Sequence, residues 1–410
     1  MRVDGRRRWV LTLFAAALGI RVVWVLLHTR QGLAFSDDAK AYHDLAVNLV
    51  EHHQFVTAID PPHRVDIPYA TRPPLTPFVL ATAYSIFGPH LLAGQLLLAM
   101  LGALTTVAVY YLGKDLFSNE VAVLAGFFTA LYPFFVFLAA VPLTENLAIP
   151  LYAFLALALV RGGAAPSCRL AVTTGCLLGV ATLNRPQVVG FFPLLVALVM
   201  LGWGSAWRAK LRHLALMVAC WAVILAPWTA RNGLLLHRWV PVSLQGGSAL
   251  YQGNNPYTQT ALTQLEHGAR GWYNDPRWGG ELAGLSPVDA DRLSLASALG
   301  FIGEHPAQAL SYAGQKLWIF FSAYDHPISR MSWYPVLALS VLGFWWSRRD
   351  WRRLLPIYCL TAQTVLTAAI FTSMPRFRAP VEPFFLLLAA VALRQGWSQW
   401  AASTGRPRTA

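Results

Sequence analysis

Apolar runs long enough to cross a bilayer recur along most of the chain, with short polar segments between them. A membrane-spanning helix needs about 20 apolar residues, and on that basis the sequence predicts about ten spans, counted to within one or two because several runs are short or contain proline. They lie near residues 9–28, 91–112, 121–140, 147–160, 170–184, 188–202, 214–230, 331–346, 354–373 and 379–394. The pattern predicts an all-α polytopic membrane protein.

Basic residues between the runs predict the orientation of the chain. The first run holds Arg21 and no small-residue cleavage site, which favours an uncleaved first span. Cytoplasmic loops carry an excess of lysine and arginine. One side of the predicted bundle carries Arg6 to Arg8, Lys114, Arg161, Arg169, the cluster from Arg208 to Arg212, the cluster from Arg348 to Arg353 and the tail with Arg406 and Arg408. We expect that side to be cytoplasmic.

Two long segments then face outward, and they set the expected domain organisation. We expect a membrane domain over residues 1–230 with a first outer loop at 29–90, an outward-facing region at 231–330, C-terminal spans at 331–396 and a polar cytoplasmic tail at 397–410. Residues 304–321 repeat apolar positions at helical spacing and predict an amphipathic helix on the outer surface. An extra span there is the alternative, and it would reverse the side of the tail.

Composition narrows the functional classes. Hydrophobic residues make up 56% of the chain and charged residues only 12%, against about 25% charged in soluble domains. The net charge of +13 is spread over short loops and forms no stripe, so it does not indicate a nucleic-acid partner. It fits membrane topology and contact with anionic membrane lipid.

Asp37 and Asp38 are the first candidates for chemistry, because they follow the outer end of the first span. Asp38 stands at or next to the start of a helical pattern, where a carboxylate caps free N–H groups. Capping explains one acid but not two. A carboxylate beside a reacting carbon can act as a general base, so both are candidate catalytic residues.

Glu145 and Arg185 also lie on the predicted outer side. Glu145 could mark the water interface, or the next helix could be capped from Thr144, but acids beside apolar runs are usually functional. Glu145 is therefore a third candidate catalytic residue, which could orient the acceptor, hold a metal or share the role of the base. Arg185 could be a snorkelling side chain at a hairpin tip. Its outward position opposes the charge rule, and an outward lipid phosphate would account for it.

Further outward arginines stand beside proline or aromatic residues that restrict the backbone. Each could be an interfacial anchor, but together they outnumber what topology needs. The candidate phosphate- or donor-binding residues are Arg72, Arg185, Arg231, Arg376 and Arg378, and the candidate substrate-binding residues are Tyr42, Tyr69 and Asn254. Four histidines of the first outer loop show no ligand spacing for a metal, so we interpret them as surface residues. They are His43, His52, His53 and His63.

These landmarks resemble the polyprenyl-phosphate-dependent glycosyltransferases of the GT-C class, and in particular the bacterial branch of glycosyltransferase family 39, which includes protein O-mannosyltransferases and lipid A aminoarabinose transferases. The resemblance covers nearly the whole chain. It is carried by the step from Asp38 to Tyr42, Arg72-Pro73-Pro74, Phe87-Gly88, Thr144-Glu145, Asn184-Arg185-Pro186, the segments Pro227 to Asn232 and Gly246 to Pro256, and the segment Arg376 to Pro383.

The resemblance implies a GT-C fold and an inverting glycosyltransferase of the cell envelope. Asp38 would be the catalytic acid/base residue, Glu145 the second-loop acid and Arg185 the contact to the lipid phosphate. The sugar would pass from a polyprenyl-phosphate donor to a lipid, glycan or protein acceptor, at a site facing outward from the inner or plasma membrane.

One departure from the family concerns cofactors. The aminoarabinose transferases have Glu-Lys-Pro where this chain has Thr71-Arg72-Pro73, so an acid associated with metal binding is missing. This counts against a zinc site. We assign no cofactor, and dependence on a divalent metal is left open.

A multi-pass transporter or flippase of a lipid-linked saccharide is the alternative function, because polar residues among apolar spans also mark substrate pathways. Transporters usually carry an inverted repeat with broken helices at the midplane. No repeat is visible here, and the candidate residues gather at one interface.

Overall fold

The computed structural model describes residues 3–29, 33, 36–57, 69–258, 280–282, 284–324 and 326–404, without the side chains of residues 3–6. His63, residues 259–279 of the expected outward-facing region and the tail beyond residue 404 with Arg406 and Arg408 lie outside these ranges. Within them every regular element is helical, as the sequence predicts.

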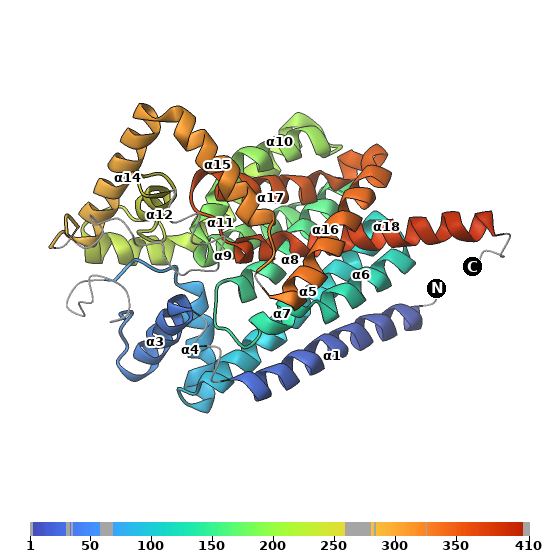
Figure 1. Cartoon of the computed structure of the whole chain (residues 1–410), viewed down its shortest axis with the longest axis horizontal. Helices are drawn as coiled ribbons and strands as arrows, with labels where there is room; N and C mark the ends of the chain where they lie inside the picture. The colour runs from blue at the N-terminus through green and yellow to red at the C-terminus, as the bar shows by residue number, and fades with distance from the viewer. Residues whose placement is uncertain are drawn as a thin grey trace.

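Long apolar helices form the body of the molecule and run broadly along its long axis (Figure 1). They are α1 (Val3–His28), α5 (Leu91–Leu116), α8 (Glu145–Ala164), α11 (Trp207–Leu236), α16 (Pro327–Ser347), α17 (Trp351–Ile370) and α18 (Glu382–Ser403). By length and composition, five described segments could each cross a membrane; one of them joins α16 and α17 through the short turn η3 (Arg348–Asp350). The chain is therefore a multi-pass membrane protein.

Shorter apolar helices complete the bundle. They are α4 (Leu75–Phe87), α6 (Asn119–Leu131), α7 (Pro133–Leu138), α9 (Cys168–Asn184), η1 (Pro186–Phe191) and α10 (Phe192–Gly202). Pro133 divides the predicted run at 121–140 into α6 and α7, because proline is accepted at the first turn of a helix but not inside one. The apolar helix α4 lies within the segment that the sequence predicts as the first outer loop.

The amphipathic and short helices gather at one end of the bundle. They are α3 (Asp37–Glu51), α12 (Gly246–Gly253), α14 (Pro287–Glu304) and α15 (Pro306–Phe321). Figure 1 shows α3, α12 and α14 at the end opposite the one where α1 begins and α18 ends. The amphipathic helix predicted at 304–321 is α15.

Close packing of α16 against α18 depends on Gly343. A methyl group on Gly343 would lie 2.0 Å from the Leu388 carbonyl oxygen, whereas one on Gly396 of α18 would meet no atom within 4 Å. Small residues at such crossings let membrane helices approach closely.

We therefore expect Gly343→Ala to lower the free energy of unfolding by about 1–3 kcal/mol, the usual effect of overpacking. Gly396→Ala is the matched control, because both sites are helical and gain equally in helix propensity. Thermal unfolding of both purified variants in detergent measures the difference, and equal midpoints would contradict this packing.

Candidate active site

The first turn of α3 separates the two predicted carboxylates. Ser36 caps the helix by accepting a hydrogen bond from the Asp38 amide at 3.2 Å. Asp37 is 83% exposed and pairs with Lys40 at 2.9 Å, whereas Asp38 turns toward the protein interior. Consecutive helical side chains point about 100° apart. The structure therefore brings Asp38 into the charged cluster and leaves Asp37 at the surface.

Asp38 bridges two arginines that come from distant parts of the chain. Its Oδ1 accepts a hydrogen bond from Arg72 Nη1 at 2.5 Å, and its Oδ2 accepts one from Arg376 Nη2. Burial alone would raise the pKa of the Asp38 carboxyl, but the charges of Arg376 and Arg72 outweigh burial and hold that pKa well below its usual range. Asp38 is therefore a carboxylate throughout the neutral range.

Glu145 is the second acid of the cluster and begins α8, where it is 2% exposed. Its Oε1 lies 3.5 Å from Arg185 Nη2 and 3.8 Å from Arg376 Nε. Arg376 thus stands between the two acids. Its buried Nε–H makes no hydrogen bond, so this guanidinium retains donor capacity.

The charges of these five side chains do not cancel. Arg72, Arg185 and Arg376 carry three positive charges against the two negative charges of Asp38 and Glu145. Burial alone would lower the pKa of Arg376, but Asp38 and Glu145 raise it above its ordinary value. The cluster therefore has one excess positive charge at neutral pH, a setting that favours an anion.

Aromatic rings support the arginines. The Arg185 and Arg376 guanidinium carbons each lie 5.6 Å from the centre of the Phe377 ring, and that of Arg72 lies 5.6 Å from the Tyr42 ring. Burial raises the pKa of Tyr42, which keeps its phenol neutral. Tyr42 therefore lies beside the cluster, and its role in substrate binding stays a prediction.

Two further residues of this region are not among the predicted site residues. Asn184 donates to the Thr144 carbonyl and accepts from the Thr76 hydroxyl, each at 2.9 Å, so it joins the end of α9 to the starts of α8 and α4. Tyr324 is near Arg376 and Glu145, and its burial raises its pKa. The polar break at Asn184 was visible in the sequence, but nothing marked Tyr324.

Arg378 lies outside the Asp38 cluster and has its own partners. Its Nε donates to Glu382 at 2.7 Å, and its Nη1 donates to the carbonyl oxygens of Phe320 and Ser322. It also lies 3.5 Å above the Trp333 ring. Through these contacts Arg378 joins η4 (Pro375–Val381) to the end of α15. Its role as a phosphate ligand stays a prediction.

Asn254 is another predicted site residue that the structure places in a helix junction. Its Nδ2 donates to the carbonyl oxygens of Leu250 and Ile370, and its Oδ1 accepts from Lys316 Nζ at 3.4 Å. Lys316 is fully buried, and burial lowers its pKa to about 8. These contacts join α12 to the end of α17, and none of them involves Asp38.

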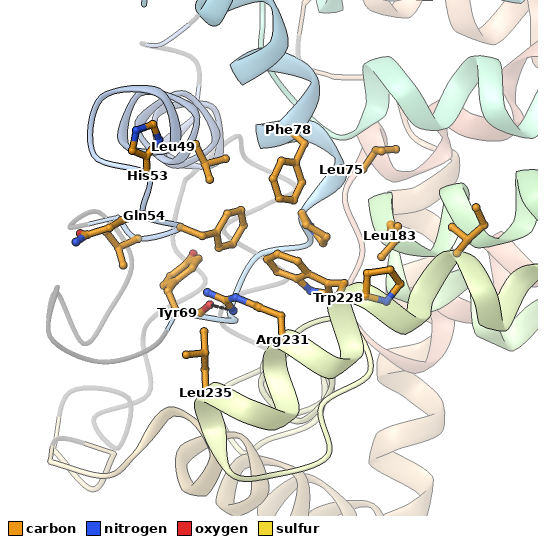
Figure 2. Close-up of a pocket in the computed structure, with 15 residues that line it drawn as sticks. Leu49, His53, Gln54, Tyr69, Leu75, Phe78, Leu183, Trp228, Arg231 and Leu235 are labelled. Carbon is orange, nitrogen blue, oxygen red and sulfur yellow. Dashed lines mark hydrogen bonds between the residues drawn. The ribbon is translucent and has the colours of Figure 1, made fainter.

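A cavity of about 690 Å³ opens between α3, α4, α9 and α11 (Figure 2). Its walls are mainly apolar, and Phe55, Phe78 and Trp228 form an aromatic group in them. Arg231 and Tyr69, two of the predicted site residues, also line it. Arg231 donates to the Tyr69 carbonyl at 2.8 Å and lies 4.7 Å from the Trp228 ring.

Residues in the wall of the cavity are close in sequence to arginines of the charged cluster. Pro74 in its wall is two residues from Arg72, and Leu183 is two residues from Arg185. An apolar cavity next to buried arginines suits an amphiphile with an anionic head.

The described His, Cys, Asp and Glu side chains form no group of three that could hold a metal ion. The two acids of the cluster face arginines instead. Outside the cluster, His43 Nδ1 lies 2.7 Å from the Tyr84 hydroxyl.

Comparison with known proteins confirms the resemblance found in the sequence. Residues 71–229 match the family model described as dolichyl-phosphate-mannose-protein mannosyltransferase. This range contains Arg72, Glu145 and Arg185 and excludes Asp38 and Arg376. No curated protein sequence matches the chain.

Solved structures align with this chain at low sequence identity. The oligosaccharyltransferase AglB from Archaeoglobus fulgidus, in complex with an inhibitory peptide and a dolichol-phosphate, aligns with a TM-score of 0.59 and 16% identity over 98% of this chain and 52% of that one. The same enzyme with zinc and sulfate aligns with a TM-score of 0.55 and 16% identity, over 95% and 49%. ArnT from Cupriavidus metallidurans bound to undecaprenyl phosphate gives 0.47 and 16%, over 97% and 79%.

This chain therefore spans about half the length of the archaeal enzyme that it resembles. At this identity the likeness establishes the GT-C fold.

Proposed function

We propose that this membrane protein, which has the GT-C fold and carries the mannosyltransferase family domain over residues 71–229, is an inverting glycosyltransferase. It moves a sugar from a polyprenyl-phosphate donor to a hydroxyl group of a lipid, glycan or protein. The observation that carries this proposal is the meeting of Arg72, Arg185 and Arg376 around Asp38 and Glu145. An apolar cavity whose wall includes residues two positions from Arg72 and from Arg185 supports it.

The arginines suit a phosphate leaving group. A guanidinium stays charged in a poorly solvated site and can bind two oxygens of one phosphate. The cluster has one excess positive charge, and the Nε–H of Arg376 has no hydrogen-bond partner. These groups stabilise the negative charge that develops as the bond between the sugar and the phosphate breaks.

Asp38 is the proposed base. It takes the proton of the acceptor hydroxyl, whose oxygen then attacks the anomeric carbon on the face opposite the phosphate. A new glycosidic bond forms, the bond to the phosphate oxygen breaks, and polyprenyl phosphate leaves with the bonding electrons. The contacts of Glu145 with Arg185 and Arg376 suit a residue that positions these two arginines.

The cavity between α4, α9 and α11 suits the lipid chain of the donor. Isoprenoid units are apolar and branched, and the cavity offers leucine side chains and aromatic rings of matching chemistry. Arg231 and Tyr69 would contact the part of the donor near its head group. Since basic loops favour the cytoplasm, the site lies at the outer face of the inner or plasma membrane.

Lipid analysis of cells that lack the protein tests this function. Mass spectrometry should find a polyprenyl-phosphate sugar that accumulates in the deletion strain, because its consumption has stopped. Re-expression of the wild-type chain should clear that lipid, whereas an Arg376→Met variant present in the membrane at equal amount should not. An unchanged pool of lipid-linked sugars in the deletion strain would refute the proposal.

A further inference from the structure

The proposed base, Asp38, is hydrogen-bonded to two of the proposed phosphate ligands, Arg72 and Arg376. Both carboxylate oxygens of Asp38 are engaged, one by Arg72 and the other by Arg376. A base whose oxygens both accept hydrogen bonds from cations holds its charge tightly. This is reflected in the depressed pKa of Asp38, and such a carboxylate is a weak acceptor for a hydroxyl proton.

The spacing of the two guanidinium groups matches a small oxyanion. Arg72 Nη1 and Arg376 Nη2 each contact a different oxygen of one carboxylate. The phosphodiester of a polyprenyl-phosphate sugar also presents two non-bridging oxygens on one central atom. It can therefore bind the same pair of guanidinium groups with the same two-oxygen arrangement.

A phosphate would gain contacts that Asp38 cannot make. Arg376 Nε has no hydrogen-bond partner, and Arg185 Nη2 lies 3.5 Å from the same Glu145 oxygen that Arg376 Nε approaches. Asp38 is fixed to α3 and reaches neither of these groups by a hydrogen bond, whereas an incoming phosphate meets all three arginines. Asp38 is also 28% exposed, against 13% for Arg72 and 10% for Arg376, so its carboxylate has room to leave the pair.

We propose that the Asp38–Arg72–Arg376 ion pair is a latch that the donor phosphate opens. The phosphate takes Arg72 and Arg376 from Asp38, and the released carboxylate becomes the base only once the donor is in place. The inference rests on the proposed function and adds an order of events to it. The donor binds before a competent base exists, so an acceptor hydroxyl cannot be activated in an empty site.

Binding of undecaprenyl phosphate to the purified full-length chain in detergent tests the latch. Asp38→Asn keeps the shape of the side chain but removes the charge that competes for the arginines. If the unlatched state makes up less than about a tenth of the wild-type protein, the variant should bind undecaprenyl phosphate at least about tenfold more tightly. Glu145→Gln is the matched control, since it also removes one negative charge near Arg376 but frees neither of the two hydrogen bonds to Asp38.

The outcomes separate this inference from the proposed function. An equal gain in affinity in Asp38→Asn and Glu145→Gln would mean that the loss of one negative charge near Arg376 explains the tighter binding. That result would overturn the latch. Unchanged or weaker binding by Asp38→Asn, with normal binding by the wild-type chain, would also overturn the latch and leave the proposed function standing. Failure of the wild-type chain to bind undecaprenyl phosphate would overturn both.

A measurement on the wild-type chain covers the case in which Asp38→Asn fails to fold. Infrared difference spectra of protein labelled with ¹³C-aspartate should show a shift of an aspartate carboxylate band when undecaprenyl phosphate is added. Bands that stay in place under saturating lipid would contradict release of Asp38 from the two arginines.

Discussion

Asp38→Asn is expected to lower the rate of sugar transfer by about 10²–10⁴-fold, the usual contribution of a general base. The amide cannot accept the acceptor proton, although the variant retains every arginine proposed to hold the phosphate. Transfer of radiolabelled sugar in proteoliposomes at saturating donor measures this loss as a fall in kcat. Combined with tighter lipid binding, it would separate the two roles of the same side chain.

Asp37→Asn is the control for this experiment. Asp37 is adjacent in sequence and carries the same charge, but its side chain is at the surface and pairs with Lys40. We expect transfer close to the wild-type rate. If Asp37→Asn were as inactive as Asp38→Asn, the result would contradict the assignment of Asp38 to the active site and of Asp37 to the surface.

Arg378→Met is expected to give the largest loss of stability, about 3–5 kcal/mol, which is typical when one partner of a buried ion pair is removed. Glu382 is 0% exposed and would lose the guanidinium that faces it. The Phe320 and Ser322 carbonyl oxygens would lose a donor as well. Unfolding of the purified variant in detergent, followed by circular dichroism, measures the loss.

The double variant Arg378→Met, Glu382→Leu distinguishes an ion-pair effect from general damage. Removing both partners takes away the unpaired buried charge, so part of the lost stability should return. An Arg378→Met variant with wild-type stability and lost binding of undecaprenyl phosphate would instead support the phosphate role that the sequence predicts for Arg378.

The three arginines of the cluster illustrate how far sequence reasoning extends. Arg185 stood out because its position opposed the charge rule, and Arg72 because proline follows it. Both lie in the cluster. Arg376 and Arg378 looked equivalent in sequence, yet only Arg376 faces Asp38, because η4 turns the two side chains toward different neighbours.

The sequence by itself determined where most of the apolar helices lie, although not α4, and that a pair of acids and several arginines border them. This follows because burial in lipid depends on the length and composition of each run, which are local properties. Tertiary structure alone decided which charged groups meet. The bond from Arg376 to Asp38 joins residues 338 positions apart, and helix geometry selected Asp38 over Asp37. Side chains from distant segments meet only where helix packing brings them together, and no local pattern encodes that packing.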